Sequence, residues 1–185
     1  MNFQTAERNI IQEISQTLDG VSPDSINQLI EKIEHADKVF FVGVGRVLLS
    51  LEAIAKRLAH LGIKTYVVGQ ITEPAITSND LLIVGSGSGE SMFPLGIARK
   101  AKSFNASIVH IGSNPESTMR QYADLFIRIP VQTKLSQPDE VTSLQPMTSL
   151  FEQSLLLLGD SVALMLIEKQ NIDMHNLWQF HANLE

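Results

Sequence analysis

The sequence predicts an α/β domain in which a parallel sheet is covered by helices on both faces. Several short apolar runs do not alternate with polar residues, as is typical of strands buried on both faces. These runs alternate along the chain with helical segments, which favours parallel connections. A length of 185 residues is usual for one domain with an ample core, so we expect a single domain over 1–185.

Two amphipathic helices are expected at the start of the chain. Residues 4–18 place isoleucine and leucine side chains on one face, and Ser22 can cap a second helix that has Pro23 at its first position. Five strands follow, at 38–43, 65–68, 81–84, 107–111 and 125–129. Helices are expected after the first strand, ending at Gly62, and after the third, from about 92 to 104. A polar loop over 130–144, a long helix over 146–170 and a shorter final helix complete the prediction.

The third strand runs directly into a loop made almost wholly of glycine and serine, Gly85–Ser91. A helix then begins near 92, so unpaired N–H groups and a partial positive charge face the loop. Ser86, Ser88 and Ser91 add hydroxyl donors, and the glycines let a ligand approach the backbone closely. Single serines are ordinary turn residues, but three on one glycine framework favour an anion site. Because the loop holds no cation, the sequence predicts one phosphate and hence a phosphorylated metabolite.

A second glycine turn, Gly43-Val44-Gly45-Arg46, follows the first strand. It begins like a dinucleotide fingerprint, but Leu48 stands where the third glycine is needed, and no acidic residue ends the second strand. NAD binding is therefore disfavoured. Ligands of such sheets bind outside the carboxyl ends of the strands, so we expect Arg46 to point into the same crevice as the serine loop.

The remaining candidate residues are a carboxylate and four histidines. Glu152 lies near the start of a strongly apolar helix, where a carboxylate suits proton transfer but also complements the helix dipole; the sequence leaves both open. His60, His175 and His181 lack the spacing of metal ligands, so no metal is expected. His110 lies within a strand and is expected to be a packed core residue.

Composition excludes several classes of function. The formal net charge is −6 and no cluster of basic residues occurs, which disfavours nucleic acid as a partner. There is no cysteine, so disulfides and thiol catalysis are excluded. No uninterrupted apolar run approaches the roughly 20 residues of a membrane span, and no leader pattern opens the chain, so a cytoplasmic protein is expected. Surplus apolar surface on the N-terminal helices (about 4–35) and C-terminal helices (about 146–181) predicts oligomer contacts.

Six segments together resemble one family. They are Gly43–Arg46, Arg57–Gly62, Gly85–Glu90, Asn114–Ser117, Gln145–Met147 with Leu150–Gln153, and the closing His181–Glu185. The serine loop resembles that of sugar isomerase (SIS) domains, and the last two segments resemble 6-phospho-3-hexuloisomerases more narrowly. The resemblance implies a three-layer α/β/α fold with a five-stranded parallel sheet, a flavodoxin-like nucleotide-binding architecture. It also implies a homotetramer, a dimer of dimers, that uses no cofactor.

The implied reaction interconverts D-arabino-hex-3-ulose 6-phosphate and fructose 6-phosphate through a cis-enediol. In this family the reaction belongs to formaldehyde fixation by the ribulose monophosphate pathway, beside hexulose-phosphate synthase. Carried over residue by residue, the resemblance implies phosphate or sugar binding by Gly45, Arg46, Ser86, Ser88, Gly89 and Ser91. It implies catalytic roles for Glu152, His181 and His60, with His60 contributed across a subunit interface.

The first loop departs from the family pattern Gly-x-Gly-Arg-Ser-Gly, because Val47 and Leu48 replace the serine and glycine. The lost hydroxyl is a plausible substrate contact, worth about 1–3 kcal/mol if its partner stays buried and unsatisfied. Two alternatives therefore stay open. One is an SIS isomerase acting on a different phosphosugar, and the other is a non-catalytic phosphosugar sensor.

Overall fold

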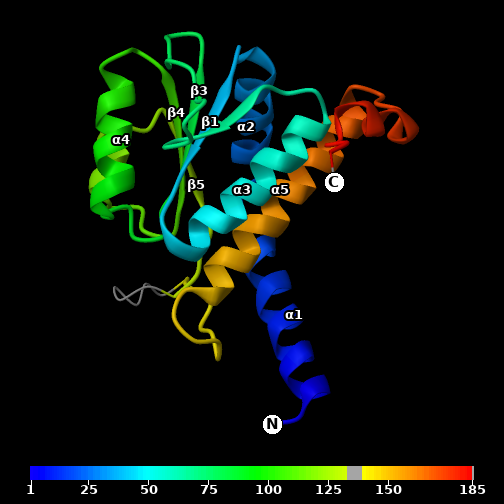
Figure 1. Ribbon diagram of the computed structural model, residues 1–185. Coiled ribbons are helices and arrows are strands. Elements are labelled where there is room, and N and C mark those ends of the chain that lie inside the picture. Colours follow the sequence, from blue (N-terminus) through cyan, green and yellow to red (C-terminus); the bar gives the residue numbers. More distant parts are fainter. Residues whose placement is uncertain (133–138, 185) are drawn as a thin grey trace.

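The computed structural model of the chain describes residues 1–132 and 139–184 (Figure 1). Five parallel strands form one sheet in the order β2-β1-β3-β4-β5. They are β1 (Val39–Val42), β2 (Thr65–Val67), β3 (Leu81–Gly85), β4 (Ser107–Gly112) and β5 (Leu125–Arg128). The chain turns to one side of β1 to form β2 and to the other to form β3, so the order reverses between β1 and β3. Loops after these two strands flank the position where ligands of such sheets bind.

Helices cover both faces of the sheet, which confirms the predicted three-layer α/β/α fold (Figure 1). The α-helices are α1 (Phe3–Asp19), α2 (Pro23–His35), α3 (Gly45–His60), α4 (Met92–Lys102) and α5 (Ser149–Lys169), and the 3-10 helices are η1 (Thr118–Gln121) and η2 (Met174–Phe180). Figure 1 shows α4 on one side of the sheet, with α2, α3 and α5 on the other. Met119 of η1 packs on the α4 side.

Alternate strand residues supply two separate cores. Phe41 and Ile83 face α2, α3 and α5, whereas Phe40 and Leu82 face α4. All four side chains are at most 2% exposed. Burial on both faces explains why the strand sequences are continuously apolar instead of alternating.

The structure corrects the predicted start of the last long helix, whereas its end at Lys169 agrees with the prediction. Helix α5 begins at Ser149, not at 146, because Met147 has φ +57 and turns the chain out of the helical path. The final helix is a 3-10 segment, and η1 is an element that the sequence patterns did not predict. The predicted polar loop over 130–144 lies partly outside the described residues.

Helix α5 is also long and apolar enough, by length and composition alone, to cross a membrane. No uninterrupted apolar run reaches this length, because Gly159 and Asp160 interrupt the apolar sequence of the helix. More than half of its apolar window, 56%, is buried inside the domain, as in the core helix of an α/β sandwich. Its apolar composition is therefore explained by packing: Leu155 and Leu166 are fully buried.

Candidate functional site

The loops after β1 and β3 lie against each other at the carboxyl edge of the sheet. A Cβ atom added to Gly85 would lie 2.9 Å from Val47 Cγ1, and one added to Gly43 would lie 3.4 Å from the Gly85 carbonyl oxygen. The first distance is shorter than real Cβ atoms show, so Gly85 leaves no room for a side chain beside Val47; the second is ordinary van der Waals contact between the two strand ends. The partly buried Val47 fills the space beside Gly85, and Leu48 packs against the same core.

The serine loop is internally braced and leaves hydroxyl hydrogens available. The buried Ser86 hydroxyl accepts the Gly89 N–H at 3.1 Å and lies 3.5 Å from the Ser91 hydroxyl. The Ser88 hydroxyl accepts the Glu90 N–H at 3.2 Å. Ser91 occupies the N-cap of α4 without a side-chain capping bond. Gly89 has φ +67, a conformation that favours glycine. The Ser88 and Ser91 hydroxyl groups can therefore donate to an anion at the start of α4, and Ser86 can do so when its hydrogen turns away from Ser91.

His110 supports this loop from below. Its ring is fully buried in β4, as expected, and its Nε2 lies 2.9 Å from the Ser86 carbonyl oxygen. A carbonyl can only accept, so Nε2 carries the hydrogen. Burial is the main reason that the pKa of His110 is lowered to about 4, while the bond to Ser86 opposes the shift. The ring is therefore neutral at physiological pH.

Arg46 and Glu152, predicted separately from the sequence, form an ion pair through Nε and Oε2. Arg46 lies in the first turn of α3 and Glu152 in the first turn of α5. The second carboxylate oxygen accepts the hydroxyl of Thr148 at 2.6 Å. The Glu152 side chain is 7% exposed and that of Arg46 is 64% exposed. The carboxylate is therefore held from both sides, beside a cation that reaches solvent, and is not a freely solvated side chain.

The ion pair and the serine loop are linked through Phe151. The Phe151 ring lies under the loop, 3.7 Å from a Cβ atom added to Gly87, and the next residue in the chain is Glu152. A cleft of about 270 Å³ opens beside the pair and is lined by Arg46, Leu49, Ser50, Glu152, Gln153 and Leu156. The Ser50 hydroxyl donates to the Glu152 carbonyl oxygen at 2.9 Å and fixes this turn of α5 on α3.

His60 and His181 lie together, but far from Glu152 within one chain. Their rings stack with centroids 5.1 Å apart. The tail docks there because the Phe180 ring lies on Gly62, where an added Cβ atom would be 3.1 Å away. His60 follows Arg46 by fourteen residues on α3, about 21 Å along the helix axis. A single subunit therefore does not bring these histidines to the ion pair.

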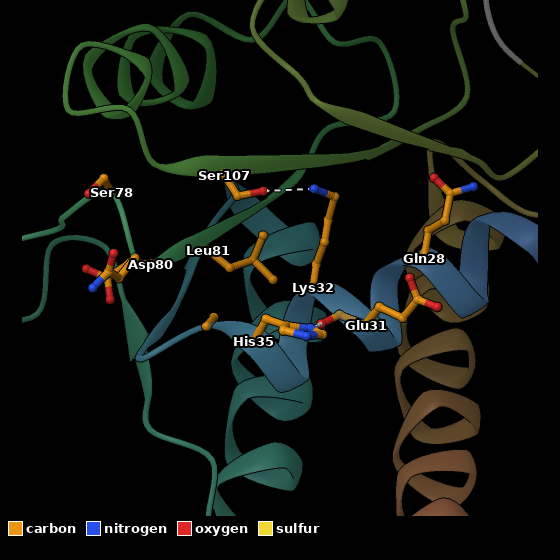
Figure 2. Close-up of a pocket in the computed structure, with 10 residues that line it drawn as sticks. Gln28, Glu31, Lys32, His35, Ser78, Asp80, Leu81 and Ser107 are labelled. Atoms are coloured by element: carbon orange, nitrogen blue, oxygen red, sulfur yellow. Dashed lines mark hydrogen bonds between the residues drawn. The ribbon is translucent and has the colours of Figure 1, made fainter.

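Larger clefts lie away from this site on the part of the chain that the structure describes. Among the residues that the structure describes, no three His, Cys, Asp or Glu side chains group as metal ligands would. A cleft of about 540 Å³ lies at the opposite, amino edge of the sheet, between α2 and the starts of β3 and β4 (Figure 2). Two of its polar side chains bind each other: Lys32 donates to Ser107 at 3.0 Å, as the dashed line in Figure 2 shows.

Sequence reading missed Thr148 and Ser50 as site residues. Thr148 precedes Glu152 by four residues, the spacing at which side chains meet on a helix, so a pattern for it was present. Ser50 contacts Glu152 only through the packing of α3 on α5, and no local pattern indicates that contact.

Comparison with known proteins places this site in a family. The SIS domain family matches residues 32–160. The chain is 39% identical to the 3-hexulose-6-phosphate isomerase of Bacillus subtilis over 176 residues, which cover 95% of each protein. It is 36% identical to the enzyme of the same name from Mycobacterium gastri, over 94% of this chain and 86% of that protein.

A solved structure agrees with these sequence matches. The fold is similar, with a TM-score of 0.85 and 30% identity, to a Methanococcus jannaschii protein whose crystal structure infers a function of 3-hexulose-6-phosphate isomerase. That alignment covers 98% of this chain and 99% of the other. The chain thus belongs to the SIS domain family, in the branch that contains the 3-hexulose-6-phosphate isomerases.

Proposed function

We infer that this chain is a sugar-phosphate isomerase that interconverts D-arabino-hex-3-ulose 6-phosphate and fructose 6-phosphate. The named relatives support this substrate pair. The observation that carries the inference is the Arg46–Glu152 pair, with its fixed carboxylate beside the serine loop. A sensor without chemistry is not favoured: Val47 and Leu48 lie against the core, and the ion pair is intact beside them.

Glu152 is proposed as the base that serves both proton transfers. Its carboxylate takes the C2 proton of the 3-ulose, the C2–H electrons form the C2–C3 double bond, and the C3 carbonyl oxygen becomes the enediolate oxygen. The proton of the C2 hydroxyl passes to the oxygen on C3, and the C2–O bond becomes the new ketone. The C2–C3 double-bond electrons take the first proton back from Glu152 at C3, which yields fructose 6-phosphate. Arg46 is the cation that stabilises the enediolate oxygen. Ser86, Ser88 and Ser91 hold the phosphate and fix C2 and C3 opposite the base.

His60 and His181 enter this proposal only through a second subunit. Because about 21 Å of helix separates His60 from Arg46, we propose that the stacked pair approaches the Glu152 cleft of a neighbouring copy in a homotetramer. Exposed apolar side chains support such an assembly: Ile11 on α1 is 57% exposed and Leu164 on α5 is 63% exposed. A cytoplasmic location and functional coupling to hexulose-phosphate synthase remain predictions.

Proton exchange tests the reaction directly. Purified protein is incubated with fructose 6-phosphate in deuterated water and followed by proton NMR. Enediol chemistry between C2 and C3 predicts loss of the C3 proton of fructose 6-phosphate and the appearance of a 3-ulose deuterated at C2.

The position of exchange also separates the alternatives. Exchange at C1 instead of C3 would indicate an isomerase that moves the carbonyl between C1 and C2. A bound but unexchanged sugar would contradict the isomerase and favour the sensor. If the protein shows no binding of fructose 6-phosphate and no exchange, its substrate is another phosphosugar.

A further inference from the structure

The loop that enters α5 is fastened to α1 by one carboxylate. Glu13 Oε1 accepts the Leu144 N–H at 2.8 Å, and Oε2 accepts the Ser143 hydroxyl at 2.7 Å and the Gln145 side-chain amide at 3.0 Å. Burial raises the pKa of Glu13, but the three donors together outweigh it and lower that pKa. One charged group therefore binds three consecutive residues, here named the Glu13 latch.

The latch is built on a rigid support. Ile14 and Leu18, one and five residues further along α1, pack against the main core. Thr17 is fully buried, and its hydroxyl donates to the Glu13 carbonyl oxygen at 2.8 Å. Figure 1 shows α1 and the loop before α5 at the same end of the molecule. A side chain on a packed helix can hold a neighbouring loop in place, because its own backbone does not move with the loop.

The fastened segment leads directly to the proposed base. After Gln145 the chain turns through Pro146 and Met147, and the Pro146 carbonyl oxygen accepts the Ser149 hydroxyl at 2.9 Å. Thr148 lies within this turn and donates to Glu152 Oε1 at 2.6 Å. Only two residues separate the latch from Thr148. No strand holds this stretch, so its position depends on such side-chain contacts.

We propose that Glu13 is a positioning residue for the isomerase reaction. It fixes the loop, the loop places the Thr148 hydroxyl, and that hydroxyl orients the Glu152 carboxylate for proton transfer. The inference rests on the proposed function of Glu152. A base must be held within about 0.5 Å of its productive position, so releasing the loop lowers turnover although Glu13 does not line the cleft.

The test compares Glu13→Gln with a matched control, Glu34→Gln. Glutamine keeps the size of Glu13 but removes the charge and turns an N–H₂ group toward donors. Glu34 on α2 also binds α5, but at the far end, through Lys169 at 2.7 Å and Gln170 at 3.2 Å. We expect kcat of Glu13→Gln to fall about ten-fold with KM changed less than about two-fold. We expect Glu34→Gln to retain wild-type kcat.

A double variant separates positioning from general destabilisation. If Glu13 acts through Thr148, adding Glu13→Gln to Thr148→Val lowers kcat no further than Thr148→Val alone. If the fold-losses of kcat in the two single variants multiply in the double variant, Glu13 does not act through this hydroxyl and the inference is overturned. Equal kcat in Glu13→Gln and Glu34→Gln would also overturn it.

A second readout does not depend on activity. Hydrogen–deuterium exchange of the amides at 143–152 is expected to quicken in Glu13→Gln and to stay at the wild-type rate in Glu34→Gln. Unchanged exchange in Glu13→Gln would overturn the inference whatever the substrate is. A wild-type protein without isomerase activity would instead contradict the proposed function, and exchange would still show whether Glu13 holds the loop.

Discussion

Acidification should destabilise the fold through His110. Burial of its ring lowers the pKa from the usual 6.5 to about 4. As the pH falls, the unfolded chain takes up a proton at this residue before the folded chain does. The stabilising contribution is therefore complete above pH 6.5 and is lost between 6.5 and about 4. The difference between the two pKa values corresponds to a total loss of about 3 kcal/mol of unfolding free energy. About 2 kcal/mol of this is lost by pH 5.

Urea unfolding of wild type and His110→Gln measures this contribution. Glutamine can keep an N–H donor toward the Ser86 carbonyl oxygen, but it does not titrate. Between pH 7.5 and pH 5 we expect the wild type to lose about 2 kcal/mol more unfolding free energy than the variant. All other titrating groups are present in both proteins and cancel in the difference. Equal losses would refute the reasoning, because His110 would then be protonated as easily in the folded chain as in the unfolded one.

Three further substitutions test the site. Glu152→Gln should lower turnover about 10²–10⁴-fold while calorimetry still detects fructose 6-phosphate binding; unchanged turnover would remove Glu152 from the base role. Gly89→Ala forces a side chain onto a backbone with φ +67 and against Ser117, so KM should rise at least about ten-fold. The control Gly96→Ala has open space around the added methyl group and should leave KM unchanged. Similar KM values in the two variants would contradict the assignment of the loop to phosphate binding. Phe151→Ala removes a ring that is 2% exposed and should cost about 3–5 kcal/mol in thermal or urea unfolding; a loss below about 1 kcal/mol would be inconsistent with its packing under the loop.

Most of the fold could be predicted because strand burial leaves a direct trace in the sequence. The run Leu81–Val84 is apolar throughout because neighbouring residues face two different cores. The carboxyl ends of parallel strands share one edge, so the sequence alone places Arg46 and the serine loop at the same edge of the sheet. The start of α5 could not be placed, since it depends on the left-handed backbone at Met147, a residue without β-branching that gives no local indication of such a turn.

The candidate site was predictable in its parts and less so in its arrangement. The sequence could not show that Glu152 pairs with Arg46, 106 residues earlier in the chain. The separation of His60 from Arg46 could be predicted from the sequence, because fourteen residues of one helix fix their distance along the axis. Docking of the C-terminal tail could not be predicted, since it depends on contact between the Phe180 ring and Gly62, which has no side chain.

The two halves of the site are held by different means, and this predicts where it is vulnerable. The serine loop follows directly from β3 and is braced by His110, so the sheet fixes its position. Glu152 follows a long connection instead, and contacts among side chains must place it: Arg46, Thr148, Ser50 and, through the loop, Glu13. Weakening these contacts should impair proton transfer while leaving phosphate binding intact. Changes to His110 beneath the serine loop should weaken phosphate binding first, because His110 bonds the Ser86 carbonyl oxygen and takes no part in the contacts that orient Glu152.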